Sequence, residues 1–305
     1  MFPKNLLIYR VNDQFKFDTD AMENQLREFA LTELSSQDRQ KFGWVSALPE
    51  TEAYVHQCNG NFLLRTGKLE KLIRSSILKK MVNKKVKEIE AQTQKPVKKK
   101  EKIEIQENIL LEILPTALVD EDYTNIFIFP SLKLVVVDAG SFNKAEGALA
   151  LLRKSLGSLP VTPVVPKSPV STTMTDWVKN GLSSDGFEMG DSAVLKSLLE
   201  DGGQVTLKRE ELTSEAVQLH LNDNKQVIAL SLDWQNRIAF TLKESMAISK
   251  VCFSDILKEQ NDDVPREDRI ARLDADFALI CGELSALLPS LIAALGGMDD
   301  ESRNQ

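Results

Sequence analysis

The sequence predicts a mixed α+β fold. Short runs that alternate in hydrophobicity, typical of strands, are interspersed with segments that repeat apolar residues every three to four positions, typical of helices. The two kinds of segment do not follow a regular strand–helix–strand rhythm, so we do not expect a parallel α/β sheet. The 305 residues are 42% hydrophobic and 27% charged, an ordinary globular composition with enough length for about two domains.

The first half of the chain alternates strands with helices. Residues 53–65 form the clearest hairpin, because Asn59-Gly60 is a preferred pair for a type I′ turn. The other expected elements are a strand over 5–11, a helix from Asp18 or Thr19 to about residue 32, a helix from Ser75 or Ser76 to about residue 92, a short helix over 108–114, a strand pair at 126–129 and 134–137, and a helix from Ser141 to Gly157.

A proline-rich segment at 159–170 separates the two halves. It holds four of the chain's eleven prolines, which favours a stiff connector between an N-terminal α+β region, 1–158, and a C-terminal α+β region, 171–305. In the C-terminal region we expect a helix from Asp191 to about Glu200, a strand over 205–209, a helix over 213–221, a hairpin of strands 227–232 and 238–242, and two acidic helices within 265–295 that separate near Gly282 or Pro289.

The cysteines and the N-terminus exclude several classes of protein. Cys58, Cys252 and Cys281 form no CxxC pair, so neither a disulfide framework nor a cysteine-based zinc site is expected, and we expect all three to be buried as small apolar side chains. The N-terminus lacks a signal-peptide pattern, and the apolar stretch 284–295 is too short to cross a bilayer. We therefore expect a reduced, cytoplasmic protein without a membrane partner.

The charge distribution indicates a polyanion-binding surface. The net charge of −7 argues against binding to nucleic acid, but residues 65–102 contain 14 Lys or Arg and 4 Glu. This stretch therefore carries +10 and the remainder of the chain −17. Such asymmetry is a known indication of a basic surface on an otherwise acidic protein.

The lysines of this stretch are patterned. Lys80, Lys84 and Lys87 recur at i, i+4 and i+7, opposite the apolar face of the predicted helix. The pattern is compatible with a solvated helix followed by a lysine-rich loop, or with a track of ammonium groups that binds phosphates without reading sequence. The DNA-binding candidates are Lys79, Lys80, Lys84, Lys87, Lys95, Lys98, Lys99, Lys100, Lys208 and Arg209.

No enzyme motif is present. The sequence has no glycine-rich phosphate loop and no GxSxG elbow, and His56 and His220 lack a zincin pattern. The acidic residues between 262 and 276 fit helix capping and i,i+4 pairs with Arg272 better than a metal site. We expect no catalytic residue, no metal and no cofactor.

Two further positions admit two readings each. Lys208 and Arg209 follow a predicted strand, either as an unremarkable exposed pair or as part of the basic surface. Leu118 follows the helix stop at Pro115, and belongs either to the core or to a subunit contact.

Several long segments resemble the bacterial recombination-associated protein family RdgC, in collinear order along the whole chain. These segments are KNL at 4–6, GWV at 43–45, GALALLRKSLGSLP at 147–160, TDWV at 175–178, KSLLEDGG at 196–203, LTSE at 212–215, LDWQ at 232–235 and REDRIARLDADF at 266–277.

The resemblance implies a non-enzymatic protein that binds double-stranded DNA, with single-stranded DNA also possible as a partner. It implies an elongated, curved protomer that closes into a ring-shaped homodimer around the duplex, restrains RecA-dependent homologous recombination and is associated with the nucleoid. Lys80, Lys84 and Lys87 would then face the hole, and Leu118 is a candidate for the dimer interface. The alternative is a regulator that contacts the recombinase directly through its acidic C-terminal half.

Overall fold

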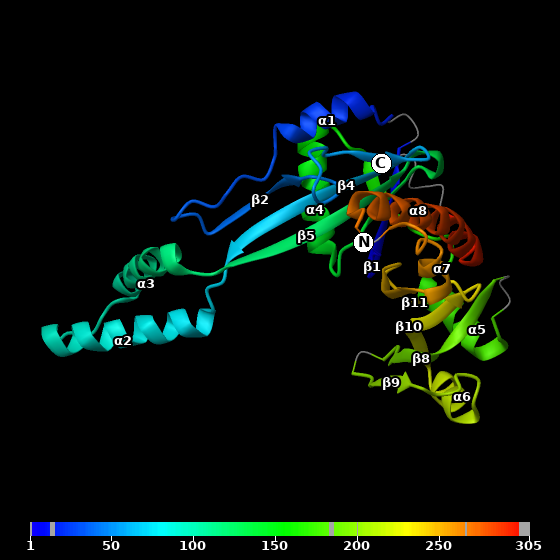
Figure 1. Ribbon diagram of the computed structural model, residues 1–305. Coiled ribbons are helices and arrows are strands. Elements are labelled where there is room, and N and C mark those ends of the chain that lie inside the picture. The colour runs from blue at the N-terminus through cyan, green and yellow to red at the C-terminus, as the bar shows by residue number, and fades with distance from the viewer. Residues whose placement is uncertain (1, 13–15, 183–185, 200, 266, 299–305) are drawn as a thin grey trace. The chain divides into compact units, whose positions relative to one another are not determined.

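The computed structural model describes residues 2–12, 16–182, 186–199, 201–265 and 267–298, and has a mixed α+β fold (Figure 1). It divides into two compact units. Unit 1 comprises residues 1–28, 46–65 and 124–305, and unit 2 comprises residues 29–45 and 66–123. Two of the four points at which the chain passes between them lie within strands, β4 (Asn61–Lys71) and β5 (Val119–Phe129). The boundary predicted at 159–170 lies inside unit 1.

Unit 1 is organised around an antiparallel sheet. Its strand order is β4-β5-β6-β1-β12-β11-β10-β8-β9, and the short strands β3 and β7 pair with β4 and β1. The proline-rich segment supplies β7, so it is a part of the sheet in this unit. The remaining bounds are β1 (Asn5–Val11), β3 (His56–Cys58), β6 (Leu134–Val137), β7 (Val161–Pro163), β8 (Phe187–Ser197), β9 (Gln204–Lys208), β10 (Lys225–Trp234), β11 (Ile238–Lys243) and β12 (Ile248–Phe253).

Helices cover the apolar side of this sheet. Met174 and Trp177 of α5 join the same core cluster as Leu230 and Leu232 of β10, so α5 lies on the buried face of that strand. The helices of unit 1 are α1 (Thr19–Arg27), α4 (Phe142–Leu156), α5 (Val170–Asn180), α6 (Glu215–Asn222), α7 (Asp255–Glu259) and α8 (Arg269–Ala294), with a 3-10 turn at Pro130–Leu132.

The C-terminal helix α8 is a core element of unit 1. Leu284, Leu287 and Leu291 are completely buried, and the side chain of Glu283 forms an ion pair with Arg237 of the loop before β11. By length and composition α8 could cross a membrane, but half of its most apolar window is buried in the protein. The core helices of soluble proteins can have the same length and composition. We therefore assign its apolar side chains to the core.

Unit 2 consists of a strand layer and a helical hairpin. Its strand order is β2-β4-β5, where β2 is Gln40–Val45, and its helices are α2 (Ser75–Thr93) and α3 (Lys99–Ile113), followed by a 3-10 turn at Leu114–Thr116. Lys71, only 6% exposed, donates from its ammonium group to the carbonyl oxygens of Ser35 and Ser36, which satisfies a buried charge.

Elements with a strong local signal are confirmed. The hairpin turns at Asn59 and Gly60, with φ of 50° and 77°, as a type I′ turn requires. The helix α4 lies between its predicted cap residues, with the Lys144 N–H donating to the Ser141 hydroxyl at 3.4 Å and Gly157 at its end. The first strand and the hairpin of β10 and β11 are also confirmed.

Three predicted helices are wrong in type or extent. Residues 191–197 belong to strand β8, which pairs with β10 on one side and β9 on the other. The two helices expected within 265–295 are one 26-residue helix that contains Pro289. The helix after Asp18 ends at Arg27, because Leu31 N–H donates to Trp44 O. Glu200 and Arg266, which the predicted elements include, lie outside the described residues.

Candidate nucleic-acid interface

Helix α2 carries the predicted row of lysines and contributes little to the core. Val82 alone of its nineteen residues is buried. Lys80, Lys84 and Lys87 lie on one side of the helix because of their i, i+4, i+7 spacing, and all three are exposed. The helix begins after Arg74 without a side-chain cap, so the expected serine cap is wrong. The lysine ridge itself is present on the surface of unit 2.

Two more lysines of α2 are exposed. Lys79 is one of the predicted contacts, whereas the sequence does not single out Lys85, because the helical periodicity places it on the apolar side. Within the described part of the chain, none of the five lysines of α2 forms an ion pair within 4.0 Å. An ammonium group without a carboxylate partner remains available to an external anion.

The segment after α2 is more ordered than the sequence predicts. The sequence predicts no helix between residue 92 and residue 108, but α3 begins at Lys99. The Lys98 backbone N–H donates to the Glu101 carboxylate at 2.9 Å, which caps the helix. Lys99 and Lys100 therefore occupy the first turn of α3, where the helix dipole disfavours cations. This local conflict is why the sequence pattern favoured a loop.

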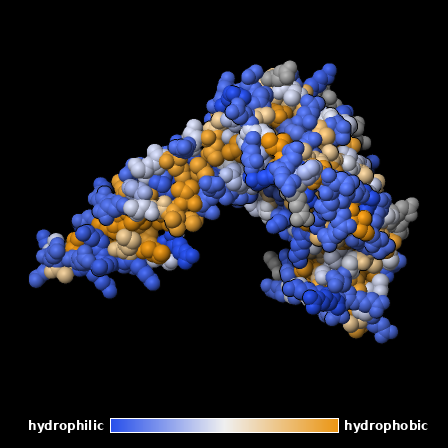
Figure 2. Space-filling model, viewed as in Figure 1, coloured by the Kyte–Doolittle hydropathy of each residue, from blue (hydrophilic) through white to orange (hydrophobic). Residues whose placement is uncertain are grey.

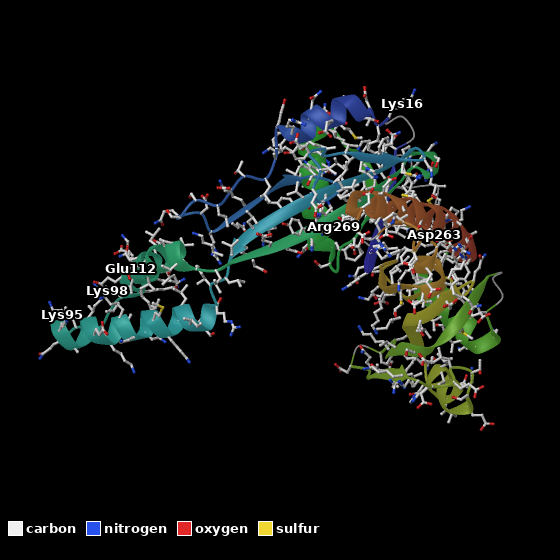
Figure 3. All side chains as sticks on the ribbon, in the orientation of Figure 1. Lys16, Lys95, Lys98, Glu112, Asp263 and Arg269 are labelled. Carbon is white, nitrogen blue, oxygen red and sulfur yellow. The ribbon has the colours of Figure 1, made fainter. Side chains whose placement is uncertain are left out.

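The turn between α2 and α3 presents further cations. The two helices lie side by side, and the Lys102 ammonium group of α3 donates to the Asn83 side-chain oxygen of α2 at 3.1 Å (Figure 1). Lys95 lies in the turn and Lys98 immediately before α3, at the end of the hairpin (Figure 3). The hairpin therefore holds the turn lysines close to one another.

The charge of this hairpin is concentrated on one helix. Residues 75–113 contain ten lysines and six glutamates, a net charge of +4. The lysines occupy α2, the turn and the start of α3, whereas Glu101, Glu104, Glu107 and Glu112 all belong to α3. The positive surface is therefore that of α2 and the turn.

Lys208 and Arg209 form a separate basic group in unit 1. Both are exposed at the end of β9, and Arg209 has a φ of 55°, in the left-handed region. They line a cavity of about 240 Å³ together with Lys250 of β12. The sequence does not predict a role for Lys250, because no other basic residue lies beside it in the strand. Only the pairing of strands in the sheet brings Lys250 near Lys208 and Arg209.

Leu118 lies on the surface, so the core reading is wrong for this chain. Its side chain is 76% exposed, and its backbone oxygen accepts the N–H of Leu72, which is also exposed. Hydrophobic side chains gather over the α2–α3 hairpin and the neighbouring strand ends (Figure 2). The exposed large apolar residues of unit 2 are Phe42, Leu72, Ile77, Met81, Ile103, Leu111, Leu118, Val119 and Tyr123.

His56 makes a contact that the sequence did not predict. Its Nε2 lies 2.9 Å from Asp274 Oδ1, which joins β3 to α8, and its ring meets Phe277 edge-on with centroids 5.2 Å apart. This contact packs two elements of unit 1 against each other. The sequence does not predict it, because no motif around His56 points to a partner 218 residues away.

The cysteines differ from one another in burial. Cys281 is buried as expected, Cys58 is half-buried and Cys252 is exposed, which corrects the expectation for Cys58 and Cys252. Burial raises the pKa of Cys281 to about 12, and burial together with the Asp274 carboxylate raises the pKa of Cys58. Thiols with a raised pKa stay protonated at neutral pH and are poor nucleophiles.

Most of the acidic residues near α8 have partners in unit 1. Asp262 accepts from Arg272 at 2.7 Å, in place of the i,i+4 pairs expected for that arginine, and Asp268 accepts from the Ala271 N–H at 3.0 Å as a cap. Across the residues described, no group of three or more His, Cys, Asp or Glu side chains is arranged to hold a metal ion.

Fold and surface together define an α+β protein that presents a row of exposed lysines on a helical hairpin and a second basic group beside a sheet cavity. A family model described as "RdgC: Putative exonuclease, RdgC" matches residues 1–298. Proteins named "Recombination-associated protein RdgC" are 42% identical over 298 residues in Tolumonas auensis, covering 97% of this chain and 99% of that protein, and 40% identical over 295 residues in Serratia proteamaculans, covering 96% and 97%. The chain therefore belongs to the RdgC family.

Proposed function

We propose that the chain binds duplex DNA through its backbone phosphates, without sequence preference and without cleaving it. The observation that carries the proposal is the set of exposed lysines on α2 and the following turn, which have no ion-pair partner in the described part of the chain. Cations crowded together in this way repel one another, and a polyanion relieves the repulsion.

The spacing of the ridge suits a nucleic-acid backbone. Seven residues separate Lys80 from Lys87, which corresponds to about 10.5 Å along a helix axis. Double-stranded DNA carries one phosphate charge per about 1.7 Å, so roughly six charges lie within that length. Contacts of this kind replace condensed counterions and carry no sequence information.

The same proposal includes a homodimer. The exposed apolar side chains of unit 2 favour association with a second copy, and Leu118 is our candidate for that contact. In the proposed assembly two copies close around the duplex as a ring, and DNA that the ring occupies is withheld from the RecA recombinase. The relatives' name, which refers to recombination, agrees with this role.

Direct contact with the recombinase through the acidic C-terminal region is the weaker candidate. Asp262, Asp268, Asp274 and Asp276 each accept a bond from a side chain or backbone group of this chain, so few carboxylates there are free to bind a basic partner. A strand-exchange assay with a large excess of duplex DNA separates the two. Relief of inhibition supports occlusion of DNA, and persistent inhibition supports direct contact.

The first test compares linear and closed-circular duplex of identical sequence, followed by a high-salt challenge. We expect the protein to leave linear DNA and to remain on circles, because a closed ring can slide off ends only. Equal loss from both would contradict the ring and leave an open electrostatic site. Incubation of both substrates with Mg²⁺ tests the absence of cleavage, and metal-dependent shortening of the linear substrate would contradict it.

A further inference from the structure

Two β-bulges interrupt the unit 1 sheet, one in β8 and one in β12. In β8, residues 190–192 oppose the single residue Ser231 of β10, since Met189 pairs with Leu232 and Ala193 with Leu230. The Ser192 N–H donates to the Ser231 hydroxyl, which in turn donates to Ser192 O, both at 2.9 Å. A bulge of this kind redirects side chains and interrupts the regular strand surface.

The second bulge lies in β12 and contains Lys250. Residues 250–251 oppose Phe240 alone, because Ala239 pairs with Cys252 and Thr241 with Ser249. Lys250 has a φ of 54°, a left-handed conformation that lysine adopts infrequently. Arg209, at the end of β9, has a φ of 55°. Two cationic residues with this uncommon backbone conformation therefore line one cavity.

That cavity has a volume of about 240 Å³ and is lined by three cations, Lys208, Arg209 and Lys250, and by one carboxylate, Asp191. In the part of the chain that the structure describes, none of the three cations has an ion-pair partner. Asp191, whose carboxylate also accepts from the Ser192 hydroxyl at 2.9 Å, offsets only one of these three positive charges. The cavity therefore has an uncompensated positive charge.

A larger neighbouring cavity, of about 720 Å³, has the opposite character. It shares Asp191 and Lys250 with the first, and adds the carboxylates of Glu210, Glu211 and Asp233. An anion is repelled from this second cavity and attracted to the first. Only the smaller cavity is therefore favourable for an anion. Its size suits one tetrahedral group better than an extended polyanion.

We propose that the smaller cavity binds a single phosphate group, with Lys250 as the cation that completes the site. The phosphate can belong to the DNA backbone or to a free phosphate compound, and the two sources share the chemistry of a compact phosphate anion held by ammonium and guanidinium groups. Only the first source rests on the proposed function, because binding of free phosphate requires no DNA.

The test uses the full chain and two substitutions at one position. Lys250→Asn removes the charge and keeps a residue that tolerates the left-handed backbone, whereas Lys250→Arg retains the charge. Lys179→Gln is the matched control, since it removes one exposed lysine from α5, which packs on the opposite face of the sheet. Circular dichroism and thermal melting confirm that each variant folds.

In the first arm, inorganic phosphate is titrated and followed by ³¹P line broadening. We expect saturable binding that weakens at least tenfold in Lys250→Asn and is retained in Lys250→Arg and Lys179→Gln. Equal binding by the wild type and Lys250→Asn, or an equal loss in the control, would overturn the proposal.

In the second arm, duplex binding is measured as a function of salt. If the phosphate is that of DNA, Lys250→Asn makes the log–log slope less negative by about 0.9, and the control does not. An unchanged slope with intact phosphate binding overturns the DNA source and supports a free phosphate compound. Failure of the wild type to bind duplex overturns the proposed function. The first arm still shows whether the cavity binds phosphate, because it uses no DNA.

Discussion

Replacement of the lysine ridge of α2 is the most direct test of the DNA interface. In the triple variant, Lys80, Lys84 and Lys87 become Gln, which has a similar helix propensity, so α2 stays folded. All three side chains are exposed and form no ion pair with the residues that the structure describes, so the substitution removes charge without removing packing. We therefore expect an unchanged melting temperature and a large change in DNA binding.

The magnitude follows from counterion release. Three lost phosphate contacts make the slope of log K against log salt less negative by about 2.7. Between 50 and 200 mM salt, the wild type should therefore lose about 40-fold more affinity than the triple variant. Fluorescence anisotropy with a short labelled duplex measures both slopes in a single titration series.

The control is a charge-matched triple variant, with the exposed Lys16, Lys167 and Lys179 of unit 1 replaced by Gln. It lowers the net charge by the same amount and leaves α2 intact. We expect its slope to match that of the wild type. Equal slopes for all three proteins would refute the assignment of the ridge, and equal reductions in both variants would show that net charge alone governs binding.

Three further outcomes are expected. Leu118→Ser should shift sedimentation toward the monomer, because it removes a 76%-exposed apolar side chain from the proposed contact, whereas Leu219→Ser, a comparably exposed change in unit 1, should not. Glu283→Gln should lower the free energy of unfolding by about 1–2 kcal/mol in urea denaturation, because Arg237 loses its charged partner; no change would contradict a stabilising pair. Because burial raises the pKa of Cys281 to about 12 from an ordinary value of 9.0, the folded protein retains a proton that the unfolded chain releases, and stability should fall as pH rises above 9. Cys281→Ala should flatten that fall, and identical pH profiles would contradict it.

The elements that the sequence predicts well are those encoded by neighbouring residues. The Asn59-Gly60 turn and the caps of α4 are local, and both are found where predicted. The lysine ridge is equally local, since i, i+4 and i+7 spacing on any helix produces a row. Its prediction required only that residues 75–92 be helical, which the structure confirms.

The failures arise from contacts between distant segments. Asp191 resembles a helix cap, but its segment pairs with β9 and β10 on its two sides, and the resulting ladder outweighs helix propensity. Pro289 predicts a break in α8, yet the helix continues through it. The buried side chains around it, among them Leu287 and Leu288, hold both halves against the same core, so tertiary packing offsets the lost backbone bond.

The cavity in unit 1 could not be predicted for the same reason. Lys208 and Arg209 attract attention as a pair, but Lys250 is 41 residues beyond Arg209 and becomes their neighbour only through the strand order β12-β11-β10-β8-β9. Bulges depend on register, and register depends on pairing across the sheet. A site assembled in this way leaves no spacing pattern along the chain.

The acidic remainder of the chain restricts where DNA can bind and does not prevent it. At about 0.1 M salt the Debye length is about 10 Å, so the −17 carried outside residues 65–102 acts mainly on nearby surfaces. The lysines of α2 then act on a phosphate in contact with them, while acidic surfaces repel the duplex elsewhere. At about 0.01 M salt the screening length rises to about 30 Å, and the distant carboxylates begin to oppose the ridge. The net charge of −7 is therefore a poor guide to binding, because the local charge within one Debye length is the quantity that the DNA senses.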